Sequence, residues 1–151
     1  MPRRISVLVA ILSALVLLLS AGLATAAASH PGAHIFSTQL TGEAEEPGPG
    51  DPDGSGTAHV LVVPAANLVC YRLTWQNLEA PVWGAHIHVG TEDTSGGVVV
   101  PLFMGMFAGT GSYQSCTRDA DADAIAANPE NYYVNIHTDE FPAGAIRGQL
   151  G

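Results

Sequence analysis

Hydrophobic side chains alternate with polar ones in short runs along most of the chain, and Gly, Pro and Asn separate these runs. Alternation with a period of two is typical of β-strands that bury one face. One segment, Asp119–Asn128, favours a helix instead, because aspartates lie in its first turn and Pro129 follows it. Short strands without intervening helices predict an all-β fold, a Greek-key-like antiparallel β-sandwich or barrel with one short helix. The predicted strands are His34–Leu40, Gly56–Val63, Leu68–Gln76, Ala85–Val89, Val98–Phe103, Thr110–Thr117, Tyr132–Thr138 and Ala145–Leu150.

The same alternation assigns side chains to the two faces of each strand. In 68–76 the apolar set is predicted to face the core, and in 85–89 so are Ala85, Ile87 and Val89. His86 and His88 therefore share the opposite face. In 132–138, with Val134 and Ile136 turned inward, His137 faces outward too. The polar face also receives Tyr133, Asn135, Arg147 and Gln149, whereas the core set of 68–76 is Val69, Tyr71, Leu73 and Trp75.

The N-terminal segment predicts where the protein goes. Arg3 and Arg4 precede the apolar run Ile5–Leu19, and small residues with A-x-A spacing follow it. This layout predicts a signal peptide over residues 1–28, cleaved after Ala26 or Ala28, and a mature domain over 29–151 that is secreted, extracellular or periplasmic. The alternative is a retained signal anchor, because 5–28 is long enough to cross a bilayer. Cleavage would leave no stable membrane insertion.

Charge narrows the range of partners. The chain has a formal net charge of −9 and no lysine, and loss of the leader leaves Arg72, Arg118 and Arg147 as its strong bases. An acidic surface repels nucleic acid phosphates, so we expect no nucleic-acid partner. Cations and extracellular proteins remain as expected partners.

Two cysteines, Cys70 and Cys116, occur in this chain bound for an oxidising compartment. A disulfide between them is the default prediction. It would close a loop of about 46 residues, which is worth roughly 4 kcal/mol in the chain-entropy estimate. The alternative, paired thiolates as metal ligands, lacks C-x-x-C spacing.

Two motifs carry a resemblance. Residues 85–90 read AHIHVG, and residues 135–150 read NIHTDEFPAGAIRGQL. They resemble the H-I-H-x-G segment and the closing N-x-H-T-x-x-F-P-x-G-x-x-R-G-x-L signature of the CHRD (chordin-type) domain family, and the likeness extends over Ile35–Leu150. At Glu45-Glu46-Pro47 the family more often has a Pro-Pro pair, a departure expected to affect only a loop. The signature is expected to be structural, through Asn135, Thr138, Phe141, Pro142, Gly144, Arg147 and Gly148.

The signature also predicts a hairpin. A turn at Pro142 and Gly144 would pair the last two strands, setting Asn135 and His137 across from Arg147 and Gln149. Arg147 would then hydrogen-bond across the pair. The family resemblance implies an extracellular domain, as in chordin, where related domains belong to an extracellular antagonist of growth factors.

The candidate metal ligands are His86, His88 and His137. Two histidines at i and i+2 present parallel rings, and a third from a neighbouring strand would complete a face suited to Cu(II) or Zn(II). Such a site would weaken as pH falls through about 6.5, where free imidazole protonates. The alternative is hydrogen bonding to Asn135, Thr138 or Arg147, and the Arg147 guanidinium would oppose a cation.

A second candidate cation site is Asp51–Gly56, which imitates the first half of an EF-hand loop. The imitation fails at position twelve, where Val62 replaces a bidentate Glu. A solvated acidic turn within a mobile connection, Glu43–Gly54, is the preferred interpretation.

These features support two function classes. The preferred one is a non-enzymatic extracellular interaction module that contacts a partner through the loops Thr91–Gly97 and Phe103–Gly109. The alternative is an extracellular copper- or zinc-binding protein, with or without redox activity. A superoxide dismutase of the copper-zinc type needs four copper histidines and a separate zinc set, and His59, His34 and His30 lie in other runs. No nucleophile elbow or triad order supports a hydrolase.

Overall fold

A computed structural model describes residues 32–151 of the chain. The predicted signal peptide and His30 lie outside the described residues. Within residues 32–151, no helix is long and apolar enough to span a membrane.

The structure is all-β, as the hydrophobic pattern predicts. The strands are β1 (His34–Thr41), β2 (Ser55–Val63), β3 (Leu68–Gln76), β4 (Val82–Val89), β5 (Val98–Phe107), β6 (Gly111–Arg118), β7 (Tyr132–Thr138) and β8 (Ile146–Gln149). One α-helix, α1 (Ala122–Ala127), lies within the predicted helical segment, and short 3-10 turns occupy Pro64–Ala66 and Pro129–Asn131.

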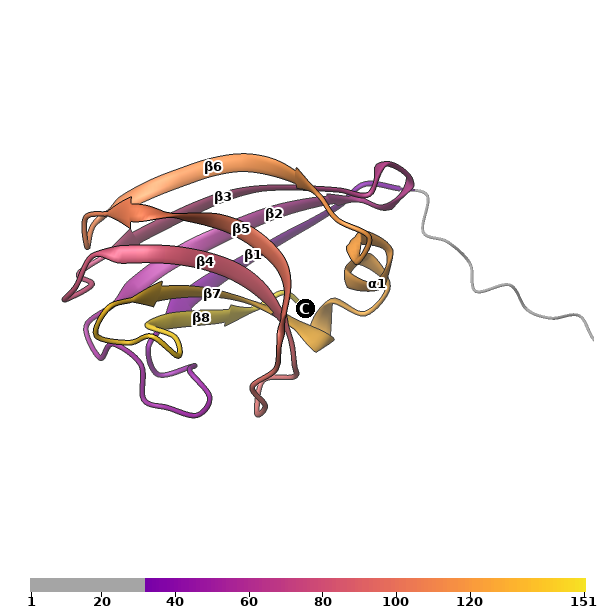
Figure 1. Ribbon diagram of the computed structural model, residues 1–151. Coiled ribbons are helices and arrows are strands. Elements are labelled where there is room, and N and C mark those ends of the chain that lie inside the picture. The colour runs from indigo at the N-terminus through magenta and orange to yellow at the C-terminus, as the bar shows by residue number, and fades with distance from the viewer. Residues whose placement is uncertain (1–31) are drawn as a thin grey trace, which may run out of the picture.

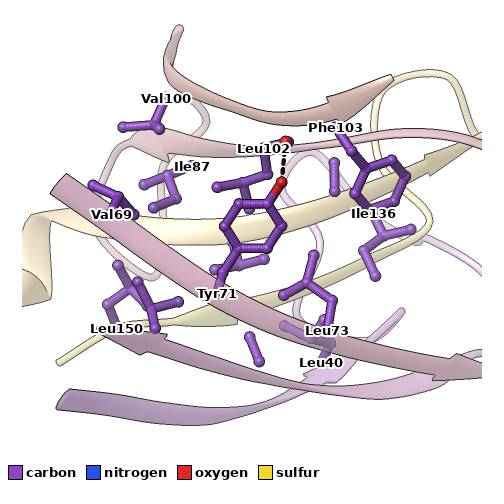
Figure 2. Close-up of a cluster of buried hydrophobic side chains, with 14 of the residues drawn as sticks. Leu40, Val69, Tyr71, Leu73, Ile87, Val100, Leu102, Phe103, Ile136 and Leu150 are labelled. Carbon is purple, nitrogen blue, oxygen red and sulfur yellow. Dashed lines mark hydrogen bonds between the residues drawn. The ribbon is translucent and has the colours of Figure 1, made fainter. Parts of the chain in front are cut away.

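The strands form one sheet in the order β5-β4-β7-β8-β1-β2-β3-β6, which curls into a nearly closed barrel (Figure 1). All pairings are antiparallel. The two edge strands, β5 and β6, approach each other where the sheet comes closest to closing. Tyr71 of β3 donates its hydroxyl hydrogen to the Leu102 carbonyl of β5 and so bridges the barrel interior (Figure 2).

The barrel interior is the hydrophobic core, filled by alternate side chains of every strand (Figure 2). The predicted core set of β3, with Tyr71 and Trp75 among its members, is buried there, as are Ala85 and Ile87 of β4. Val89 is the exception, at 42% exposure, because it is the last residue of β4 and lies past the packed interior. Burying this much apolar surface is the main favourable contribution to folding.

Strand β5 is longer than predicted and corrects one proposed loop. Residues 103–107 belong to the strand because Phe103 and Phe107 both pack on Trp75, at ring-centroid distances of 5.8 Å. The predicted contact loop Phe103–Gly109 is therefore wrong over most of its length. The other predicted loop, Thr91–Gly97, is an exposed connection between β4 and β5.

Two covalent and topological predictions are confirmed. Cys70 of β3 and Cys116 of β6 are directly opposite in the sheet and form a disulfide, which ties the edge strand β6 to its neighbour β3. Strands β7 and β8 pair as a hairpin, with Asn135 opposite Arg147. Tyr133, and not His137, lies opposite Gln149.

Candidate metal centre

The polar side chains of β4, β7 and β8 project from the outer face of the barrel, and that face is covered. His86, His88, Asn135, His137 and Arg147 are between 2% and 9% exposed. The side chains lie on the predicted face opposite the core, and the structure adds that this face is buried. The reason is that two connections, 42–54 after β1 and 90–97 after β4, fold across the face; in Figure 1 they hang below β7 and β8.

The connection 42–54 is an ordered cover and not the predicted mobile loop. Glu45 is 4% exposed, and its carboxylate Oε2 accepts a hydrogen bond from Asn135 Nδ2 at 3.1 Å. Asp51 is fully buried, and its carboxylate accepts backbone N–H bonds from Asp53, Gly54 and Glu79. The preferred interpretation of a solvated acidic turn is therefore wrong at Asp51, which organises the loop backbone.

The connection 90–97 is held by β8 and β7. Arg147 donates to the carbonyl oxygens of Thr91 at 2.6 Å and Thr94 at 3.0 Å, and its Cζ lies 3.5 Å from the Tyr133 ring centroid. The Gly96 N–H donates to the Tyr133 hydroxyl oxygen at 3.2 Å. The predicted hydrogen bond of Arg147 across the hairpin is therefore wrong, because the guanidinium bonds to loop carbonyls instead.

A bulge in β4 shapes the site. The pairing of β4 with β7 shifts between Val82 and Gly84, so Trp83 is an extra residue of β4 relative to β7. Its ring turns onto the polar face, where it stacks on His137 with centroids 5.0 Å apart and lies 6.1 Å from His86. The bulge thus places an indole beside two of the three imidazoles.

The three predicted histidines converge because β4 and β7 are neighbours. Gly84 pairs with His137 and His86 pairs with Asn135, which brings the third imidazole beside the other two. Ring centroids are 4.9 Å apart for His86 and His137, and 5.6 Å for the other two pairs. One ring nitrogen from each residue lies within 4.8 Å of the others. This spacing suits three ligands of a single ion.

The hydrogen bonds leave one nitrogen of each ring available. His88 Nδ1 lies 2.9 Å from the Gly96 carbonyl, and His137 Nδ1 lies 3.2 Å from the Pro142 carbonyl. A carbonyl only accepts, so both rings carry their proton on Nδ1 and keep a lone pair on Nε2. Both Nε2 atoms, together with His86 Nδ1, are buried without a hydrogen-bond partner. Backbone carbonyls commonly orient metal-binding histidines in this way.

Electrostatics keep the rings neutral. Burial and then the neighbouring His86 and His88 lower the pKa of His137 from 6.5 to about 4, although its bond to the Pro142 carbonyl raises it. The pKa values of His86 and His88 are also lowered, chiefly by burial. Neutral imidazole is the form that binds metal ions. Arg147 lowers the pKa of His88 further, and its guanidinium is held by carbonyls and by Tyr133.

A buried carboxyl joins the same face. Burial raises the pKa of Glu45 from 4.5 to about 7, although the Asn135 hydrogen bond and the Arg147 charge lower it. Gly144 leaves room for this pair: a Cβ there would lie 2.3 Å from Glu45 Oε2 and 2.6 Å from Asn135 Nδ2. The departure at Glu45 thus affects the site and not only a loop. Nothing in the acidic, Pro-rich stretch 43–54 marks Glu45 as buried.

Unpartnered polar atoms concentrate on this one face. Within residues 32–151, the buried side-chain atoms without a hydrogen-bond partner are Glu45 Oε1, His86 Nδ1, His88 Nε2, Asn135 Oδ1 and His137 Nε2. A buried polar atom without a partner costs about 1 to 3 kcal/mol, so this face concentrates groups that can still accept or donate a bond. The remaining described histidines stay apart from the cluster, and exposed His59 pairs with Ser37 Oγ at 2.9 Å.

Several residues of the closing signature contact the hairpin or the covering loops. Thr138 Oγ1 accepts from the Phe141 N–H at 3.1 Å and closes the turn before Pro142. Gly148 lies against β1, where a Cβ would come 2.2 Å from the Gln39 carbonyl oxygen. Asn135 and Arg147 hold the two covering loops.

Comparison with known proteins identifies the family of the chain. The CHRD domain matches over residues 36–150, which includes both the H-x-H strand and the closing hairpin. No curated protein and no solved structure gives a significant match. The match covers most of the chain, and the chain therefore belongs to the CHRD domain family.

Proposed function

We propose that this protein is an exported, non-enzymatic metal-binding domain that holds one Cu(II) or Zn(II) ion through His86, His88 and His137. The observation that carries the proposal is the set of three buried, unpartnered ring nitrogens within 4.8 Å of one another. Imidazole nitrogen is a preferred ligand of both metals. The leader-like N-terminus and the Cys70–Cys116 disulfide support export into an oxidising compartment.

The surroundings of the histidines also suit a bound ion. Glu45 and Asn135 each keep a free acceptor oxygen on the same face, and these oxygens suit the hydrogens of a metal-bound water. A fully satisfied hydrogen-bond network would leave no such atoms, so simple pairing of the histidines with Asn135, Thr138 or Arg147 is the weaker account.

Titration calorimetry of the dialysed mature domain with zinc sulfate or copper sulfate tests the proposal. We expect saturable binding of one equivalent, and loss of binding on His137→Ala. His59→Ala is the matched control, because His59 is an exposed strand histidine remote from β4 and β7 in the sheet order. Absence of saturable heat, or an equal loss in the control, would refute the proposal.

An interaction role is the second candidate, and one observation favours it. The connection 91–97 is fully exposed, yet Arg147, Gln149 and Tyr133 fix its backbone, which is how a recognition loop is presented. Photo-crosslinking from Glu92 on the exported protein tests this role. A partner linked from Glu92 but not from exposed Gln114 on β6 would support it, and equal linking from both positions would count against it.

A further inference from the structure

The two methionines of the described residues lie on β5, the edge strand next to β4, which carries His86 and His88. Met104 and Met106 of β5 are each 67% exposed, whereas methionine side chains more often fill cores. Phe103 and Phe107 of the same strand face the core, so the intervening methionines project from the histidine face. This placement leaves two thioethers exposed at the edge of a buried cluster.

Met104 lies near the His86 imidazole. It pairs with Gly84 of β4, which lies two residues before His86. A Cβ placed on Gly84 would lie 3.1 Å from Met104 Sδ and 3.6 Å from Cε1 of His86. The missing side chain at residue 84 thus gives the sulfur room next to the His86 ring.

Trp83 adds a second soft group. Its ring stacks on His137 and lies near His86, on the same face as the thioether. The face of an indole attracts cations through its quadrupole, and it has no hard oxygen to offer. A thioether and an indole therefore lie near the His86 ring, and the indole also stacks on His137.

We propose that Met104 supplies a thioether ligand to the histidine centre and that the centre consequently favours Cu(I) over Zn(II). The chemistry is that of ligand softness: thioether sulfur binds Cu(I) well, whereas zinc takes nitrogen, thiolate and carboxylate ligands. This inference rests on the proposed function, because it needs the three histidines to bind a metal.

The test compares Cu(I) and Zn(II) affinities of wild type, Met104→Leu and Met106→Leu domains. Cu(I) affinity is measured without oxygen by competition with bicinchoninate, and Zn(II) affinity by competition with a chromogenic chelator. Met104→Leu should weaken Cu(I) binding by about tenfold or more and leave Zn(II) binding within about twofold, because only Cu(I) uses the sulfur. Met106→Leu is the matched control on the same strand and should change neither.

X-ray absorption of the Cu(I)-loaded domain provides the structural readout. A sulfur shell should appear in wild type and Met106→Leu and disappear in Met104→Leu. If Met104→Leu binds Cu(I) as tightly as wild type while His137→Ala loses both metals, the thioether ligand is refuted and the histidine site stands. If no variant or wild type binds either metal, both proposals fall.

Discussion

Glu45 shows how a single buried side chain can make stability depend on pH. Its pKa is raised to about 7 by burial, so the folded protein holds a proton that the unfolded chain releases above about 4.5. A raised folded pKa contributes stability that is fully present below 4.5 and is lost as pH rises through about 7. The carboxyl therefore favours folding in mild acid and opposes it in mild base.

Replacing Glu45 by Gln should remove this dependence. The amide keeps the shape and a partner for Asn135 but cannot ionise, so the variant should gain stability relative to wild type by about 1 to 3 kcal/mol between pH 5 and pH 8. Urea unfolding of the metal-free domains at both pH values measures the difference. Exposed Glu46→Gln is the control and should show no such trend; a constant difference for Glu45→Gln would contradict the shifted pKa.

The residues of the site were predictable to different degrees. His86, His88 and His137 could be placed on one face because each alternates with apolar residues that need the core. Glu45, Trp83 and Met104 could not. Glu45 lies in a loop without hydrophobic periodicity, and a bulge turns Trp83. Met104 lies beyond the predicted end of its strand, so alternation did not assign it to a face.

Strand β8 anchors one of the two loops that cover the histidines. Arg147 is 2% exposed and satisfies two carbonyls of the 90–97 connection, so its role is to hold a loop against the sheet. The strands themselves were predictable from alternation. The folding of the two loops over the site was not predictable, because hydrogen bonds to backbone carbonyls leave no pattern in the sequence.

Replacing Arg147 by Ala should lower the unfolding free energy of the metal-free domain by about 1 to 3 kcal/mol, because the Thr91 and Thr94 carbonyls lose their donor. Amide hydrogen exchange should accelerate at residues 91–97 more than in β1. Arg118→Ala is the control, since this exposed arginine donates a single bond, to the Ala66 carbonyl, and should cost less. An unchanged melting temperature for Arg147→Ala would show that the loop does not need this anchor.

The stability of the edge strand β6 is expected to depend on the disulfide. Its sheet neighbour is β3, and the Cys70–Cys116 disulfide ties the two. Replacing both cysteines by Ala should lower stability by roughly 2 to 5 kcal/mol, with exchange rising first in β6. Chemical denaturation and exchange mass spectrometry measure both effects. Uniform acceleration across all strands would argue that the bond acts only on the unfolded chain.

On the scale of the whole molecule, the barrel separates two environments. Its interior is apolar, and the polar centre lies on its outer face beneath two covering loops. Burial under these loops lowers the imidazole pKa values, so the site should resist acid better than exposed histidines would.

Zinc affinity should therefore fall less between pH 7.5 and pH 6 than it would with three ordinary histidines, because the pKa values of His86 and His88 are lowered and that of His137 is about 4. Protons compete with the metal for the same nitrogens, and a lowered pKa moves that competition to lower pH. Three ordinary histidines with a pKa of about 6.5 would lose about 50-fold over this interval. Calorimetric titrations at several pH values distinguish the two curves, and a steep loss above pH 6 would contradict the depressed pKa values.

The bulge at Trp83 has an optical consequence. The chain has two tryptophans, and they occupy opposite sides of the sheet: Trp75 is enclosed in the interior, where its Nε1 donates to the Ala108 carbonyl, whereas Trp83 stacks on His137. Copper bound at the histidines would quench the emission of Trp83 far more than that of Trp75. A Trp75→Phe domain would then report its own occupancy by intrinsic fluorescence, without any added dye.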